Sequence, residues 1–236
     1  MIRGTVKLHT IRPSECCDAS VLSPSERERA ESFRFRADAL RWMSFRASMR
    51  TILGVCLGLP ASEVPIRISE SGKPLLDGPY QRLHFSLSHT NDLAILALSE
   101  AGPVGVDLEP IARASDLLDC ESSFCDPLEI AGLPEETSAR QDRLLHLWTM
   151  KEAVLKAVGT GFLVPPESVR LEAREGSVHR AITTHFPHLF DPQKIRSIDH
   201  AGLAAYRIAL SSVEDHWEFI DSGASTDTTD APIILH

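Results

Sequence analysis

The chain has 236 residues, of which 43% are hydrophobic, and its 24 basic and 33 acidic residues give a formal net charge of −9. A chain of this length and apolar content can bury a core as one large domain or as two small ones. The acidic balance argues against a general nucleic-acid-binding protein. The five cysteines show no metal-binding spacing, and their odd number and scatter predict free thiols in a reducing cytoplasm.

Neither a signal peptide nor a membrane span is indicated by the sequence. The first seven residues lack the apolar core of a signal peptide. The longest apolar run, residues 52–59, is far too short to cross a bilayer. We therefore expect a cytoplasmic globular protein without a membrane partner.

The first half of the chain alternates between strand and helix patterns. Ser23-Pro24-Ser25-Glu26 predicts a helix start, because it combines a cap serine, a first-turn proline and a following glutamate. A second helix is expected over residues 38–57, ending before Gly58. Strands are expected over residues 6–11, 66–68, 83–88, 93–99 and 104–109. The last two are expected to form a hairpin that turns at residues 100–103.

The second half repeats the same kind of pattern. Weak helical segments are expected near residues 115–124 and 128–133, before a long helix over residues 138–158. Further strands are expected over residues 168–173, 178–184, 195–199 and 204–210. This order predicts an α+β fold of two related subdomains that meet at a cleft. Residues 221–236 are small, polar and acidic, which predicts a flexible tail.

The long helix carries charges on its apolar side. At about 100° per residue, one apolar arc is formed by Leu144, Leu147, Trp148, Val154, Leu155 and Val158. Lys151 lies in the middle of this arc, and Glu152 and Lys156 lie along its edge. A lysine that points into a core is costly unless it is paired or opens into a polar site. The helix is therefore expected to line a functional cleft, with acidic partners elsewhere in the chain.

Those partners are expected on the strand at residues 104–109. Successive strand residues point to opposite faces, so Asp107 and Glu109 share a face while Leu108 points away. Two acids on one face repel each other, and a hard cation such as Mg²⁺ relieves the repulsion. The alternative is a strand that frays into solvent before Pro110.

Four segments together carry a family resemblance. They are G-K-P at 72–74, F-S-L-S-H at 85–89, G-V-D-L-E at 105–109 and W-T-M-K-E-A-V-L-K-A at 148–157. In order and spacing the chain resembles the 4′-phosphopantetheinyl transferase superfamily, in its long two-subdomain, surfactin-synthetase-activating branch. The resemblance covers roughly residues 20–175, and Ser86 stands where the family often has asparagine.

The resemblance implies both a fold and a reaction. The fold would be two similar subdomains in a pseudo-twofold arrangement, each a small sheet packed on a long helix, with the active site in the cleft between them. Residues 1–111 would carry the coenzyme A contacts and the D-x-E strand, and residues 112–220 the W-x-x-K-E helix. The enzyme would be a monomer that transfers 4′-phosphopantetheine from coenzyme A to a serine of an apo acyl or peptidyl carrier protein. It would use Mg²⁺, with Mn²⁺ as an alternative, and release 3′,5′-ADP.

Site residues follow from the resemblance position by position. The metal-binding carboxylates would be Asp107, Glu109 and Glu152. Glu152 would be a metal ligand or the base that takes the serine proton, and Lys156 would meet the phosphate or leaving group. Lys151 is assigned a supporting role, and Trp148 is expected to be a packing anchor. Contacts to the coenzyme are expected from Lys73, Ser88, His89, Arg29, Arg41 and Arg46. The family's F-S-x-x-E segment has only an imperfect counterpart, with Glu129 one residue late, so no role is assigned to Glu129.

Two rival functions use the same residues differently. A metal-dependent hydrolase of nucleotide pyrophosphates would use the three carboxylates with water in place of serine. A degenerate family member would bind coenzyme A or a carrier protein without turnover, although intact Asp107, Glu109, Glu152 and Lys156 argue against it. The sequence leaves open which carrier protein or pathway is served and whether acylated coenzyme A is accepted.

Overall fold

The computed structural model describes residues 4–14, 17–174, 178–183, 189, 191 and 193–221. The expected tail lies outside these residues except for Asp221, and so does Cys16. In the described part of the chain, no helix has the length and apolar character needed to span a bilayer.

Most of the expected elements are present. The first half contains β1 (Thr5–Ile11), α1 (Pro24–Glu31), α2 (Arg36–Leu57), β2 (Ile66–Ile68), β3 (Pro74–Leu76), β4 (His84–His89), β5 (Ala94–Ser99) and β6 (Gly105–Pro110). The second half contains α3 (Pro127–Ala131), α4 (Thr137–Val158), β7 (Arg170–Ala173), β8 (Val178–Ile182), β9 (Lys194–Ile198), β10 (Tyr206–Ser212) and β11 (His216–Asp221). The helix start predicted before α1 is a complete capping box, in which Ser23 and Glu26 each bind the other's backbone N–H.

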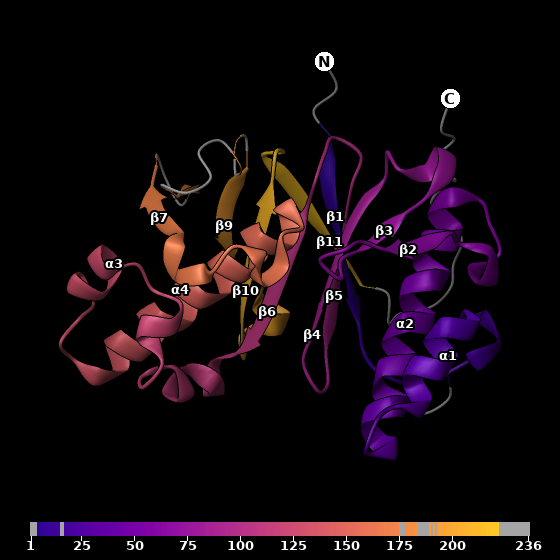
Figure 1. Cartoon of the computed structure of the whole chain (residues 1–236), viewed down its shortest axis with the longest axis horizontal. Coiled ribbons are helices and arrows are strands. Elements are labelled where there is room, and N and C mark those ends of the chain that lie inside the picture. The colour runs from indigo at the N-terminus through magenta and orange to yellow at the C-terminus, as the bar shows by residue number, and fades with distance from the viewer. Residues whose placement is uncertain are drawn as a thin grey trace.

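Two sheets lie between two long helices (Figure 1). One sheet has the strand order β11-β1-β5-β4 and the other the order β6-β10-β9-β8-β7. Apolar side chains from both sheets form one shared cluster, which includes Leu8 and Ile95 of the first and Leu108 and Ile208 of the second. On the outer faces, α2 packs against the first sheet and α4 against the second. This α+β architecture of two halves, each a sheet packed on a long helix, confirms the predicted fold class.

The predicted hairpin of the strands at 93–99 and 104–109 is wrong. β5 pairs with β1 and β4, whereas β6 pairs with β10 in the other sheet. β6 is linked to β4 by side chains: Ser86 Oγ accepts a hydrogen bond from Val106 N, and Ser88 Oγ accepts one from Leu108 N, each at 3.2 Å. Two serine hydroxyls therefore take the place of backbone carbonyls where the two sheets meet.

The predicted boundary at residue 111 does not separate the two sheets. β6 precedes this boundary but belongs to the five-stranded sheet, and β11 follows it but belongs to the four-stranded sheet. β11, which the sequence analysis missed, pairs in parallel with β1 from Thr5↔His216 to Thr10↔Asp221. Each half of the chain thus contributes one strand to the sheet of the other half.

Gly105 lets α4 lie directly on β6. A Cβ atom at this position would be 2.0 Å from the carbonyl oxygen of Ala153 and 2.4 Å from the amide nitrogen of Ala157. Any side chain here would have to push α4 away from the strand. The close approach brings the carboxylates of β6 next to the charges of α4.

Candidate active site

Asp107 stands at the centre of a polar cluster between β6, β4 and α4. Its side chain is almost fully buried. Its Oδ1 accepts hydrogen bonds from Lys156 Nζ at 2.6 Å and from Ser88 Oγ at 2.9 Å. Lys156 Nζ also donates to Ser88 Oγ at 3.0 Å. Three predicted site residues therefore form one network, in which the lysine neutralises the buried aspartate.

Glu109 points to the same face of β6 as Asp107, as the alternation predicted. Its Oε1 accepts a hydrogen bond from Trp148 Nε1 at 2.8 Å. The same oxygen forms an ion pair with Arg113, which lies in the 3₁₀ helix Ile111–Leu117. Trp148 is packed edge-on against Phe124 and partly covered by the arginine. It is therefore a packing anchor and also holds Glu109, and Arg113 is a site residue that the sequence analysis missed.

Glu152 of α4 is close enough to Asp107 and Glu109 to interact with their charges. Burial raises the pKa of its carboxyl group, and the charges of Asp107 and Glu109 raise it further. Lys156 and Arg113 oppose the increase. Burial and like charge both favour the protonated form of a carboxyl group, so Glu152 is a stronger proton acceptor than an exposed glutamate.

Lys151 has a different partner from the one the sequence predicted. It is fully buried, as its place in the apolar arc requires, but its Nζ contacts Glu129 Oε2 at 2.6 Å and not Asp107 or Glu109. Two backbone carbonyls, those of Phe124 at 2.6 Å and Pro166 at 3.1 Å, accept its other hydrogen bonds. Lys151 thus forms a structural ion pair with Glu129 that fastens α3 and its neighbouring loops to α4. Glu129 was the missing counter-charge, and the need of a buried lysine for an acid was the signal that could have found it.

Lys73 lies in a cavity beside the carboxylates. The cavity has a volume of about 300 Å³ and is bounded by the G-K-P loop, β4 and the end of α4, with Glu152 and Lys156 in its wall. Lys73 Nζ donates to the carbonyl oxygens of Ala157 at 3.0 Å and Val104 at 3.4 Å. Burial lowers the pKa of Lys73 to about 8. Lys73 therefore places its positive charge at the negative C-terminal end of α4, and its hydrogen bond to Ala157 joins the two halves of the chain.

A group of cations surrounds His89 at the end of β4. The imidazole stacks on Phe45 of α2, with ring centroids 5.2 Å apart. Burial lowers the pKa of His89, and three nearby cations act in the same direction. These cations are Lys156, Arg46 and Arg41. His89, Arg41, Arg46 and Lys156, four of the residues predicted to contact the coenzyme or its leaving group, therefore interact electrostatically with one another.

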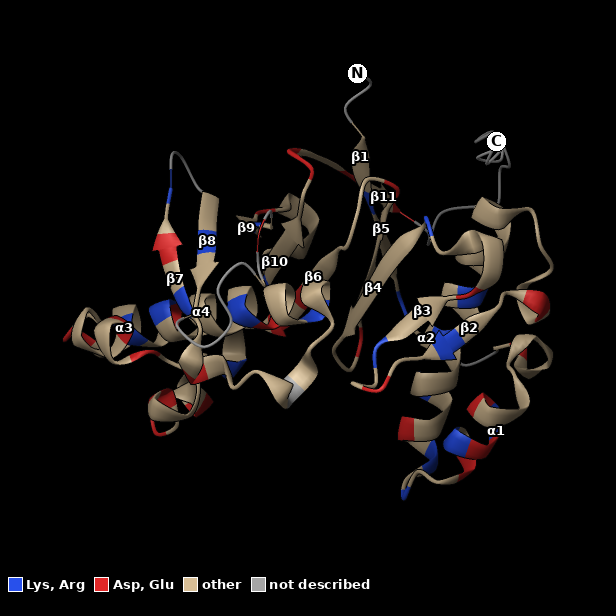
Figure 2. Ribbon diagram, turned by 45° about the horizontal axis from the view of Figure 1, so that its top comes forward, with Lys and Arg blue, Asp and Glu red and all other residues tan. Residues whose placement is uncertain are grey.

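Arg29 is not drawn into this group by any described contact. It lies in the last turn of α1, where it contacts Ser32 and Phe33. Acidic residues alternate with the arginines of α1 (Figure 2), and α2 carries Asp38 near its start, so the arginine-rich segment is not a uniform basic face. Arg50 of the arginine-rich segment is buried and forms an ion pair with Glu26, which gives this arginine a structural role.

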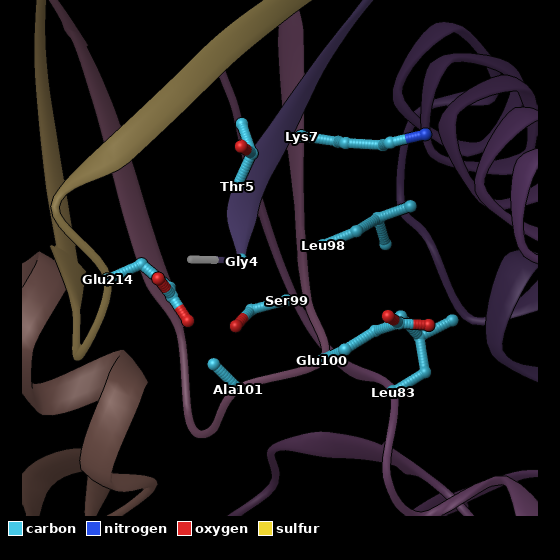
Figure 3. A pocket seen from close by; sticks show the side chains of 9 residues that line it. All are labelled: Gly4, Thr5, Lys7, Leu83, Leu98, Ser99, Glu100, Ala101 and Glu214. Carbon is cyan, nitrogen blue, oxygen red and sulfur yellow. The ribbon is translucent and has the colours of Figure 1, made fainter. Parts of the chain in front are cut away.

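A second, smaller cavity lies away from the carboxylates, at the start of β1 (Figure 3). Its volume of about 60 Å³ has room for a few water molecules only. The Ser99 hydroxyl faces it and has no hydrogen-bond partner among the described residues. This space is too small for a nucleotide. The cavity beside Lys73 is the candidate binding site, because it is roomier and has Glu152 and Lys156 in its wall.

The carboxylate cluster fits a divalent cation by its donors, although not as a finished site. Among the residues that the structure describes, no three His, Cys, Asp or Glu side chains are arranged as a ready-made metal site. Mg²⁺, however, takes one or two carboxylates and keeps several waters. Asp107 Oδ2 is buried and has no hydrogen-bond partner within the described chain. An orphaned carboxylate oxygen, with two further acids in electrostatic reach, suits such an ion.

Comparison with family models covers most of the chain. Residues 12–101 match the model described as "4′-phosphopantetheinyl transferase, N-terminal", and residues 103–211 match that of the "4′-phosphopantetheinyl transferase superfamily". A curated relative, the 4′-phosphopantetheinyl transferase HetI of Nostoc sp., is 34% identical over 65% of this chain and 70% of its own length. The chain belongs to the 4′-phosphopantetheinyl transferase superfamily.

Other members of the superfamily align over similar lengths. The 4′-phosphopantetheinyl transferase Sfp of Bacillus subtilis is 31% identical over 67% of this chain and 70% of its own length. A second Bacillus subtilis 4′-phosphopantetheinyl transferase is 26% identical over 86% of each chain. The matches to both halves confirm the predicted two-subdomain branch, and the chain is a phosphopantetheinyl transferase enzyme. All the predicted site residues of this transferase lie inside the two matched segments.

Proposed function

We propose that this enzyme transfers 4′-phosphopantetheine from coenzyme A to a serine of an apo acyl or peptidyl carrier protein, with Mg²⁺, and releases 3′,5′-ADP. One observation carries the proposal. The cavity that holds Lys73 opens beside Glu152 and Lys156, and these residues adjoin the buried Asp107. A phosphate-bearing substrate, a cation site and a proton acceptor would thus meet at one place.

Three carboxylates would hold the metal ion: Asp107, Glu109 and Glu152. When bound, Mg²⁺ supplies charge neutralisation on the pyrophosphate oxygens and fixes their orientation. Mn²⁺ prefers similar oxygen ligands and is an alternative. The orphaned Asp107 Oδ2 supports this assignment, because it is a buried carboxylate oxygen of the cluster without a hydrogen-bond partner among the described residues.

Two lysines are placed to bind the phosphate groups of coenzyme A. Lys156 is about one-third exposed, so its ammonium group is accessible to a phosphoryl oxygen while it remains next to Ser88 and Asp107. Lys73 lines the cavity itself. Arg41 and Arg46, two of the three cations near His89, are proposed to contact another phosphate group of coenzyme A or its adenine. Arg29 is proposed to lie at the edge of the site.

Glu152 is proposed to accept the proton of the carrier serine. The serine oxygen would form a bond to the β-phosphorus of coenzyme A, and the bond from that phosphorus to the oxygen bridging the pyrophosphate would break. The serine proton would pass to the Glu152 carboxylate, and the leaving 3′,5′-ADP would take the electron pair of the broken bond. The raised pKa of Glu152, caused first by burial, suits a base in this step. The other role of Glu152, as a metal ligand only, would leave the proton to water.

The two halves are proposed to act as one monomeric, cytoplasmic unit, with residues 1–111 supplying the coenzyme contacts and the D-x-E strand and residues 112–220 the W-x-x-K-E helix. The contacts of Lys73 with Ala157 and of Lys156 with Ser88 support this division of labour, since each crosses from one half to the other.

The proposed reaction is tested by intact-mass spectrometry of an apo carrier protein incubated with the enzyme, coenzyme A and Mg²⁺. We expect the carrier serine to gain the mass of one phosphopantetheine group, and EDTA to prevent the gain. Breakdown of coenzyme A without a carrier would instead identify a pyrophosphate hydrolase. Coenzyme binding in calorimetry without modification of acyl or peptidyl carriers would identify a non-catalytic binder.

Lys73 makes coenzyme use dependent on pH. Burial lowers its pKa to about 8, so the free enzyme loses this positive charge as the pH rises through about 8. We expect kcat/KM for coenzyme A to fall across that range, because kcat/KM reports ionisations of the free enzyme. Lys73→Arg should keep its charge and remove this fall, and Lys73→Ala should raise the KM for coenzyme A at every pH. An unchanged KM in Lys73→Ala would reject the proposed role.

A further inference from the structure

Arg113 occupies an unusual position for a residue outside the sequence motifs. It follows the metal-binding strand by one turn, in the 3₁₀ helix Ile111–Leu117, and pairs with Glu109 Oε1. Its guanidinium group lies over the ring of Trp148, 5.5 Å from the centroid. Trp148 donates to the same Oε1 at 2.8 Å. One oxygen of Glu109 is therefore held by two groups, of which only one is charged.

The positive charge of Arg113 reaches the whole carboxylate cluster. Burial disfavours its charged form, but the attraction of Glu109, Asp107 and Asp116 outweighs this and raises the pKa of Arg113. Arg113 also opposes the increase in the pKa of Glu152. All three carboxylates proposed as metal ligands thus interact with this one guanidinium group.

We propose that Arg113 joins Lys156 as an internal cation that balances the three carboxylates while no metal is bound, and that Arg113 leaves Glu109 when the divalent ion binds. The inference rests on the proposed metal-dependent function. Arg113 is a positioning residue and touches neither substrate nor reacting atoms. It holds Glu109 in place, and in doing so it competes with the metal.

The surroundings allow Arg113 to leave without disturbing Glu109. Its side chain is 41% exposed, whereas that of Glu109 is only 12% exposed. Solvent can take the guanidinium group, and the hydrogen bond from Trp148 continues to orient the carboxylate. The ion pair of Lys156 with Asp107 is less open, because that aspartate is 4% exposed and Ser88 binds both partners.

The test is the binding of Mn²⁺ to the full-length protein by calorimetry, without coenzyme or carrier. Arg113→Gln should lower the Kd for Mn²⁺ by roughly five- to tenfold, because a positive charge next to the cation site has been removed. Arg113→Lys, which keeps the charge, should bind Mn²⁺ within about twofold of the unaltered enzyme. Arg140→Gln is the matched control: this arginine also forms an ion pair with a glutamate, Glu121, in the same half of the protein. It should leave the Kd unchanged.

A second readout reports directly on the arginine. In a variant with Trp42→Phe and Trp217→Phe, the fluorescence of Trp148 should change when Mg²⁺ is added, and Arg113→Gln should remove most of that change. An unchanged or higher Kd for Mn²⁺ in Arg113→Gln would overturn the competing-cation proposal, as would the absence of Mn²⁺ binding by the unaltered enzyme. The proposed transfer reaction is tested separately, by the mass that the carrier protein gains.

Discussion

Asp107→Asn is expected to reduce phosphopantetheine transfer by roughly 10²- to 10³-fold, as is typical when a group that stabilises charge in the transition state is lost. The asparagine can still accept the hydrogen bond from Ser88, so its shape and part of its network are kept. It cannot supply the negative charge that would hold a divalent ion at Oδ2 or attract Lys156 at Oδ1. Initial rates of carrier modification at saturating coenzyme A measure the loss.

A change in folding must be separated from this loss of rate. Asp142→Asn is the matched control, since Asp142 is an exposed aspartate on α4 that pairs with Arg207. It should retain nearly full activity, and both variants should unfold at similar denaturant concentrations. If Asp107→Asn kept more than about a tenth of the activity at high Mg²⁺, a tenfold limit that corresponds to about 1.4 kcal/mol, Asp107 would be peripheral to the reaction.

Lys151→Met should lower the free energy of unfolding by about 3–5 kcal/mol, as expected when one partner of a buried ion pair is removed. The methionine fills much of the space, but the Glu129 carboxylate loses its counter-charge and two carbonyl oxygens lose their donor. Denaturant unfolding followed by circular dichroism measures the difference. Lys194→Met is the control, because this lysine forms a half-exposed ion pair with Asp215 and should cost at most about 1 kcal/mol.

The double variant Lys151→Met with Glu129→Gln isolates the cost of the unpaired charge. Glu129 Oε1 accepts a hydrogen bond from Leu171 N and Oε2 accepts one from Asp126 N, so the single amide oxygen of glutamine keeps one of the two while the charge is removed. The double variant should therefore be more stable than Lys151→Met alone. Equal stability of the two would show that the lost donor, and not the stranded charge, causes the destabilisation.

Local patterns predicted most of the elements because the residues that define them are neighbours in sequence. The cap before α1 needs only Ser23, Pro24 and Glu26, and the length of α4 follows from its own periodicity and from Gly159, which ends it with a positive φ of 77°. The alternation in β6 correctly placed Asp107 and Glu109 on one face. The family and the fold class followed from motifs that are equally local.

Pairings between distant segments could not be predicted in this way. A short connection made β5 and β6 look like a hairpin, but which sheet receives a strand depends on the packing of the whole chain. β11 was missed although its Trp217 and Phe219 alternate with polar residues and pack against the shared apolar cluster. The partner of Lys151 was misplaced for the same reason: several acids could have reached a buried lysine, and only the position of α3 selects Glu129. The roles of the individual site residues remain predictions that the experiments above can test.

The exchange of β6 and β11 between the sheets bears on how the protein is synthesised. A ribosome releases the N-terminal half first, but one edge of β1 stays unpaired until β11, the last described element, has been synthesised. Until then the nascent chain exposes an unpaired strand edge, and β6 waits for β10 in the same way. Folding in vivo should therefore finish after translation and not half by half, and separately expressed halves should be prone to aggregation.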